Sequence, residues 1–166
     1  MPLIPGKPAT QSSLDDELTT ILTAMKIADE TLSSLGTVQD DDHLLVSVEA
    51  NSYYIVEGWI RYVSASTSSD LRINYSYPAS AAFARNDFGT ATSAAATAAE
   101  AVDMTVVTTG DNGRGSGTTE RGVSVKGFLQ TSTTAGTFRV RWAQVTSSAD
   151  SLTVKTGSWI KLTKIN

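Results

Sequence analysis

The sequence predicts an all-β fold: an antiparallel β-sandwich or jelly roll with an extended N-terminal arm and one short N-terminal helix. After residue 27, short runs of alternating apolar and polar residues follow one another, separated by clusters of Ser, Thr, Asp, Asn and Gly. Few helical patterns interrupt these runs, which excludes a regular alternation of strands and helices. The 166 residues suit one such domain, because single domains usually span about 100 to 200 residues.

Residues 1–25 are predicted to form a docking arm and a short helix, and residues 26–166 the sandwich domain. Prolines at positions 2, 5 and 8 exclude a helix or a central strand from the first residues. From the suitable N-cap Ser13 onward, apolar residues recur at helical spacing, and acidic residues lie where the helix dipole favours them. The residues expected to bind a partner are Leu3, Ile4, Pro5, Leu14, Leu18, Ile21 and Leu22.

Strands follow at short intervals through the rest of the chain. The longest predicted strand, 53–64, has one cleanly apolar face, and its other face carries Trp59, a candidate for a subunit or ligand contact. In 137–145, apolar residues alternate with Arg139 and Arg141, which is typical of a half-buried strand. The predicted strands are 44–49, 53–64, 71–77, 102–108, 123–132, 137–145, 152–156 and 159–165.

Two segments interrupt this pattern. Residues 90–101 are almost entirely Ala and Thr, a composition that suits a short helix and a surface loop equally. Residues 110–117 are rich in glycine, but they lack the Lys and Ser or Thr of a phosphate-binding loop, and no helical pattern follows them. We expect this segment to be a hairpin tip whose Arg114 contacts a neighbouring subunit or ligand.

Composition excludes several classes of partner. The net charge is −4 and no basic stripe is present, so nucleic acid is not expected to bind. No apolar run reaches the roughly 18 residues of a membrane span, and the N-terminus lacks a secretory pattern, so we expect no membrane partner and synthesis in the cytoplasm. The chain has no cysteine, which excludes disulfides and thiolate metal sites.

No catalytic, cofactor-binding or metal site is predicted. Asp40, Asp41 and Asp42 form the densest acidic cluster, yet three acids before a strand are more often a solvated turn than a calcium site. His43 is the only histidine, and no Gly-x-Ser-x-Gly elbow accompanies it. The tryptophans and tyrosines suit a sugar-binding groove, but within alternating strands a core or subunit seam is their commoner place.

Several motifs occur in the order found in one family. Residues 26–44 contain Ala-Asp-Glu-Thr followed by Leu-Gly-Thr-Val-Gln-Asp-Asp-Asp, and residues 50–58 read Ala-Asn-Ser-Tyr-Tyr-Ile-Val-Glu-Gly. Near the end, Trp-Ala-Gln at 142–144 and Gly-Ser-Trp-Ile-Lys-Leu at 157–162 follow. This pattern resembles a C-terminal β-domain of virion proteins from actinobacterial tailed phages. The resemblance implies a virion component without catalytic residues.

The resulting hypothesis is a non-enzymatic capsid decoration protein, assembled in the host cytoplasm into the virion. We expect a homotrimer whose arm and helix bind the major capsid protein or neighbouring copies, because the chain has few charges and more adhesive surface than a monomer requires. The alternative is a tail-fibre or tail-tip module that recognises host surface glycans. A glycan-degrading enzyme ranks last, because the acidic residues are dispersed over turns.

Overall fold

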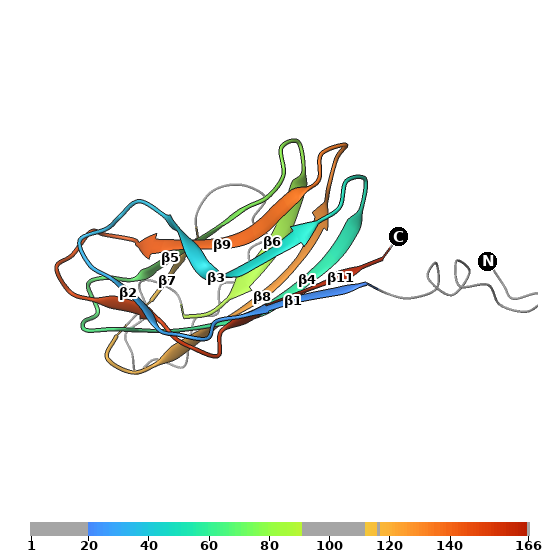
Figure 1. Ribbon diagram of the computed structural model, residues 1–166. Helices are drawn as coiled ribbons and strands as arrows, with labels where there is room; N and C mark the ends of the chain where they lie inside the picture. The colour runs from blue at the N-terminus through green and yellow to red at the C-terminus, as the bar shows by residue number, and fades with distance from the viewer. Residues whose placement is uncertain (1–19, 91–111, 116, 166) are drawn as a thin grey trace, which may run out of the picture.

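The structure, a computed structural model, describes residues 20–90, 112–115 and 117–165 (Figure 1). These residues form two antiparallel sheets without a helix, which confirms the predicted all-β antiparallel fold. None of the described segments is a helix long and apolar enough to cross a membrane. The strands are β1 (Ile21–Met25), β2 (Glu30–Leu32), β3 (Gln39–Val48), β4 (Tyr53–Ser64), β5 (Leu71–Ser76), β6 (Ala82–Phe88), β7 (Asn112–Arg114), β8 (Arg121–Gln130), β9 (Gly136–Gln144), β10 (Leu152–Val154) and β11 (Trp159–Lys164).

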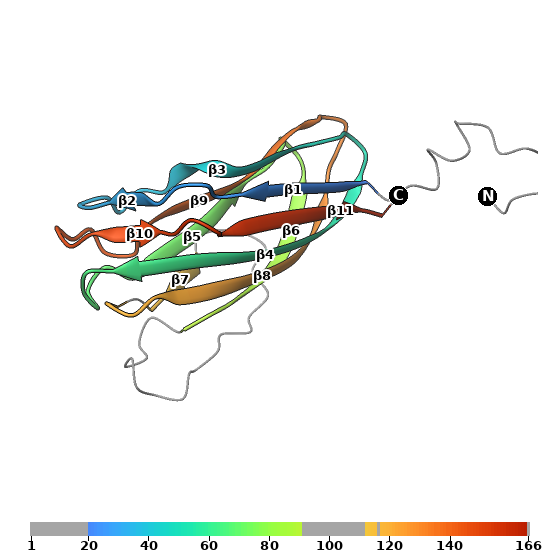
Figure 2. The same cartoon turned by 60° about the horizontal axis from the view of Figure 1, so that its bottom comes forward.

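The larger sheet is organised around β4, the longest strand described (Figure 2). One edge of β4 pairs with β8 from Tyr53 to Tyr62, and β6 continues the sheet beyond β8. The other edge of β4 pairs with β11 over most of its length and with β10 near its end. β1 lies beyond β11, and β2 lies beyond β10. The smaller sheet has the order β3-β9-β5-β7 and packs over one face of the larger sheet.

The hydrophobic core lies between the two sheets, and the inward faces predicted for 53–64 and 137–145 are confirmed. Alternation puts every second side chain of β4 and β9 into this interior, where burial of apolar area stabilises the fold. Phe83 of the larger sheet meets Phe138 of the smaller one edge to face, with ring centroids 5.1 Å apart. The residues that form these two apolar faces are at most 1% exposed: Tyr54, Val56, Ile60, Tyr62, Phe138, Val140 and Trp142.

The predicted helix is wrong at its C-terminal end, because Ile21 and Leu22 belong to strand β1. This strand pairs with β11, from Ile21 opposite Thr163 to Met25 opposite Trp159. The apolar spacing suits a helix locally, but pairing with the edge of β11 satisfies the backbone and overrides that tendency. The sheet thus begins before residue 26, the predicted start of the sandwich domain. Outside the described residues lie Leu3, Ile4, Pro5, Leu14 and Leu18.

Other strand boundaries differ from the predicted ones. β3 begins at Gln39 rather than residue 44, and its register with β9 shifts between Asp40 and Leu45, where alternation is lost. β2 and β6 were not predicted: β2 has three residues, and β6 contains two inward-facing charges. Within 110–117, residues Asn112–Arg114 form β7. The predicted strand 102–108 and nearly all of 90–101 lie outside the described residues.

A polar cluster in the core links the two sheets. The Tyr75 hydroxyl of β5 donates to Asp87 of β6 at 2.9 Å, and Arg85 Nε donates to the other oxygen of that carboxylate at 3.0 Å. The Arg85 guanidinium also lies over the Tyr75 ring, 4.7 Å from its centroid. Inward charges on an edge strand oppose pairing with another chain while satisfying one another inside the fold.

Arg114, which was predicted as a subunit or ligand contact, is buried beside this cluster. The side chain is 1% exposed on β7, where its guanidinium donates to the carbonyl oxygens of Gly113 and Asp87. Arg114 therefore does not lie at an exposed tip and cannot serve as a surface contact. The glycine-rich composition suggested an open loop, but a strand pairing with β5 holds this part of the segment.

The substitution Tyr75→Phe is expected to reduce the loss of stability at alkaline pH. Burial raises the pKa of Tyr75 well above its ordinary value, and the Asp87 carboxylate raises it further. The phenol ionises near pH 10 in the unfolded chain but stays protonated in the folded one. The contribution of the protonated phenol to the free energy of unfolding is therefore complete below about pH 10. It is lost, by about 1.4 kcal/mol per pH unit, as the pH rises toward the pKa of the folded state. Urea unfolding of both proteins across this pH range measures the difference, and parallel profiles would contradict it.

Candidate interaction face

The outer face of the larger sheet carries large apolar side chains where a half-buried strand normally presents polar ones. Met25, Trp159 and Trp59 lie directly opposite one another on β1, β11 and β4 and form one row. A second row crosses the same strands through Ile55 and continues to Phe128 on β8. We call this surface the outer apolar face, and its exposed residues are Ile21, Met25, Tyr53, Ile55, Trp59, Phe128 and Trp159.

A charged row separates the two apolar rows. Glu57 of β4 lies between Lys161 of β11 and Lys126 of β8. Its carboxylate is 2.5 Å from Lys161 Nζ. This contact, assisted by the charge of Lys126, lowers the pKa of Glu57 below its ordinary value. Apolar rows flanking an ordered ion pair give the face a pattern that a complementary protein surface can match.

Gly122 on β8 leaves room for the side chain of Trp59. The indole ring of Trp59 lies over Gly122, where a Cβ atom would come within 2.0 Å of the ring. The ring therefore lies along the sheet, which leaves it 41% exposed and accessible to a partner. Trp59 was predicted as a contact residue from its place on the polar face of a strand. Its side chain is exposed in the structure, and the contact itself stays a prediction.

The structure brings together further residues that sequence reasoning missed. Among the predicted contact residues, Ile21 and Trp59 lie on the outer apolar face, whereas Leu22 is half-buried against the core. Ile55 and Phe128 were not singled out, and Trp159 was considered only among the tryptophans expected in a core or subunit seam, because each lies in a strand whose pairing partners the sequence does not reveal. Each could have been recognised from the sequence as a large apolar residue at a strand position that points away from the core.

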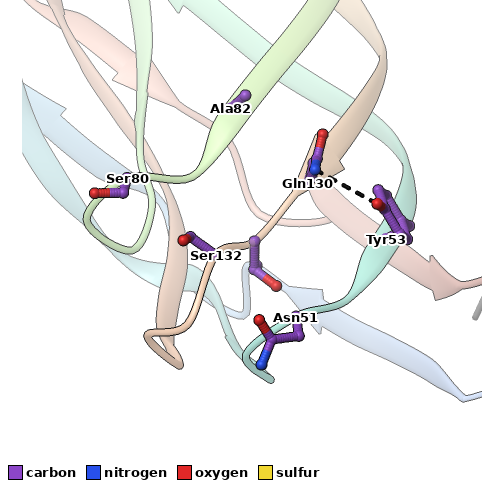
Figure 3. A pocket seen from close by; sticks show the side chains of 7 residues that line it. Asn51, Tyr53, Ser80, Ala82, Gln130 and Ser132 are labelled. Atoms are coloured by element: carbon purple, nitrogen blue, oxygen red, sulfur yellow. Dashed lines mark hydrogen bonds between the residues drawn. The ribbon is translucent and has the colours of Figure 1, made fainter.

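A polar pocket of about 370 Å³ opens at the end of the larger sheet where β4 and β6 begin and β8 ends (Figure 3). The Tyr53 ring stands at one side, and Gln130 Nε2 donates to its hydroxyl at 3.5 Å. Amide and hydroxyl groups prevail among the other lining side chains. The residues lining the pocket are Asn51, Tyr53, Ser80, Ala82, Gln130, Thr131 and Ser132.

The acidic cluster of the sequence is divided between surface and interior. Asp40 is exposed and bonds to Arg139 and Arg141. Asp41 is buried, and its carboxylate contacts the ammonium of Lys26, which is also buried.

Glu30, Asp41 and His43 have potential metal-ligand atoms within 4.8 Å of one another. The Lys26 Nζ lies 2.5 Å from Glu30 and 2.7 Å from Asp41, so a cation already contacts both carboxylates. A metal ion would have to displace this ammonium from a fully buried position. The donor set therefore does not fit a metal while Lys26 stays in place.

Comparisons with known proteins assign no family. No family model and no curated protein matches the chain. Among solved structures, it is similar to a chain of infectious bursal disease virus, Gx strain, at 11% identity and a TM-score of 0.32. A chain of the Gt strain is similar at 13% identity and a TM-score of 0.27.

In both cases the alignment covers 99% of the present chain but only 43% and 45% of the viral chains. The present chain thus spans less than half the length of these viral chains.

Proposed function

We propose that this protein is a structural component of a tailed-bacteriophage virion and acts as a capsid decoration protein. The outer apolar face is the observation that supports the proposal. Seven large apolar side chains, each at least 38% exposed, gather on one sheet, and such patches usually mark protein contacts. Between them, the Glu57–Lys161 pair supplies polar contacts that can set the orientation of the partner.

In this proposal the protein acts by adding contact area rather than by chemistry. The sandwich docks on the capsid surface, where copies of the chain, expected as trimers, and the major capsid protein cover one another's apolar surface. The sequence motifs that resemble those of actinobacterial phage virion proteins favour the virion over other assemblies. The part of the predicted arm that precedes β1 would extend the contact.

Copy number tests the decoration role. Quantitative mass spectrometry of purified virions measures the copies per particle, and sedimentation measures the mass of the isolated oligomer. A decoration protein is expected in many copies that scale with the number of capsomers, and as a trimer. A few copies per particle would assign the protein to the tail and contradict the decoration role.

The substitution Phe128→Glu is expected to weaken assembly through the outer apolar face at least tenfold. A charge within an apolar interface must be desolvated without a partner, and truncating a principal contact residue often costs about 2 kcal/mol or more. Sedimentation equilibrium and rebinding to virions stripped of the protein measure the effect. Ser47→Glu is the matched control, because Ser47 is exposed on β3 of the other sheet. Equal assembly of both variants would contradict the proposed face.

The polar pocket favours a second candidate function, recognition of a host surface glycan. The exposed Tyr53 ring beside amide and hydroxyl groups has the chemistry that binds sugar rings. A glycan array probed with the full chain tests this function. Binding that disappears in Gln130→Ala, but not in Ser47→Ala, would support it over the decoration role.

A further inference from the structure

We propose that Lys26 and Asp41 become joined by an intramolecular isopeptide bond, with Glu30 as the catalytic acid and base. Lys26 directly follows β1 of the larger sheet, and Asp41 lies in β3 of the smaller one. The bond would therefore fasten the two sheets to each other, in a chain that has no cysteine for a disulfide.

The reacting groups are in contact and shielded from water. The Lys26 Nζ is 2.7 Å from Oδ2 of Asp41, and both side chains are 0% exposed. The backbone holds Lys26 in place: its N–H donates to Ser158 at 2.7 Å, and its carbonyl accepts from Gly157 at 2.8 Å. Such fixed proximity converts a slow reaction between separate molecules into a favourable step within one.

The surroundings of Asp41 suit attack on its carboxyl carbon. Its Oδ1 accepts backbone N–H groups from His43 and Leu44, both at 2.9 Å. Attack by an amine places negative charge on one carboxyl oxygen of a tetrahedral intermediate, and two aligned N–H donors stabilise that charge. Because these donors hold Oδ1, the oxygen beside Lys26, Oδ2, is the one free to leave.

Glu30 is placed to move the protons. Its Oε2 is 2.5 Å from the Lys26 Nζ, and Gln39 orients the carboxylate by donating to Oε1 at 2.7 Å. Glu30 first takes a proton from the ammonium, which frees the nitrogen lone pair for attack on Cγ of Asp41. It then returns this proton to Oδ2 and carries a second proton from the same nitrogen to Oδ2 once the Nζ–Cγ bond has formed.

The reaction balances without a cofactor, oxidant or second substrate. The Nζ–Cγ bond forms, the Cγ–Oδ2 bond breaks, and Oδ2 leaves as water with two of the three ammonium protons. The third proton remains on the amide nitrogen, and Glu30 ends as it began. The product replaces two buried opposite charges by a neutral amide, which removes a large desolvation cost.

The other lysine–carboxylate contacts among the described residues lack this arrangement. Lys155, Lys161 and Lys164 each bond to a carboxylate, but these side chains are at least 21% exposed to water. Water competes for both groups at such sites, and free ions are then favoured over condensation. These three lysines serve as internal controls.

Intact-mass measurement of the full chain under denaturing conditions tests the proposal. The expected mass is lower than the sequence mass by one water molecule in nearly all molecules. Peptide mapping is expected to yield a branched peptide containing Lys26 and Asp41, without tryptic cleavage after Lys26 and with Lys161 unmodified. Full sequence mass with cleavage at Lys26, or loss of water mapped to other residues, would overturn the proposal.

Two variants separate the chemistry from the packing. Glu30→Gln keeps the size of the side chain but removes its acid and base function, so the full sequence mass is expected. Asp41→Asn presents an amide as the leaving group, and the same cross-link is expected to form with loss of ammonia instead of water. Lys155→Arg is the control expected to cross-link as the natural chain does. Cross-linking in Glu30→Gln at the natural rate would overturn the role of Glu30.

Discussion

Truncation of Trp142 to alanine is expected to lower the free energy of unfolding by about 3 to 5 kcal/mol, the usual cost of removing a large aromatic side chain from a core. Trp142 is fully buried on β9, the strand that pairs with both β3 and β5 in the smaller sheet. Its removal leaves a cavity that the paired strands on both sides cannot close. Urea unfolding followed by far-ultraviolet circular dichroism measures the change.

Trp159→Ala is the matched control for Trp142→Ala. The Trp159 side chain is 39% exposed on the outer apolar face, so its truncation creates a surface depression that water fills. The expected loss is roughly 1 kcal/mol. Equal losses for the two variants would contradict the packing described for the core.

The substitution Asp87→Ala is expected to cost about 3 to 5 kcal/mol, because it removes one partner from a buried ion pair. The Asp87 carboxylate accepts from Tyr75 and Arg85, whose side chains lie between the two sheets. Without it, the guanidinium stays buried and loses this neutralising contact. Thermal and urea unfolding of the variant give the magnitude.

The double variant Arg85→Met, Asp87→Leu distinguishes the charge from the packing. It removes both ions and keeps similar side-chain volumes, so most of the lost stability is expected to return. A double variant as unstable as Asp87→Ala alone would show that the cost arises from altered packing and not from the unpaired charge.

Alternation within strands was enough to predict much of the fold. β4 was predicted with its full bounds, and β9 with the correct inward face, because each strand has one consistently apolar side. The pattern failed where pairing decides the structure. Ile21 and Leu22 occur at a spacing that suits a helix, and only the free edge of β11 makes this segment a strand.

The functional surfaces were less predictable, because they depend on residues brought together from several strands. Trp59 was visible as an apolar residue on a polar face, but its neighbour Trp159 lies a hundred residues further along the chain. Arg114 was placed at the surface because glycine surrounds it, although it is buried. Nothing in the sequence indicated that Lys26 is buried, because its partner Asp41 comes into contact with it only in the folded chain.

The two ends of the described sandwich lie side by side, and this sets how the protein responds to mechanical load. Thr20 accepts the backbone N–H of Lys164, so β1 and β11 begin and finish at the same end of the sheet (Figure 1). A force that pulls these ends apart acts across the antiparallel ladder and opens its hydrogen bonds one after another. β1 would peel from its partner as far as Lys26, where the proposed covalent link to β3 would pass the load on to the smaller sheet.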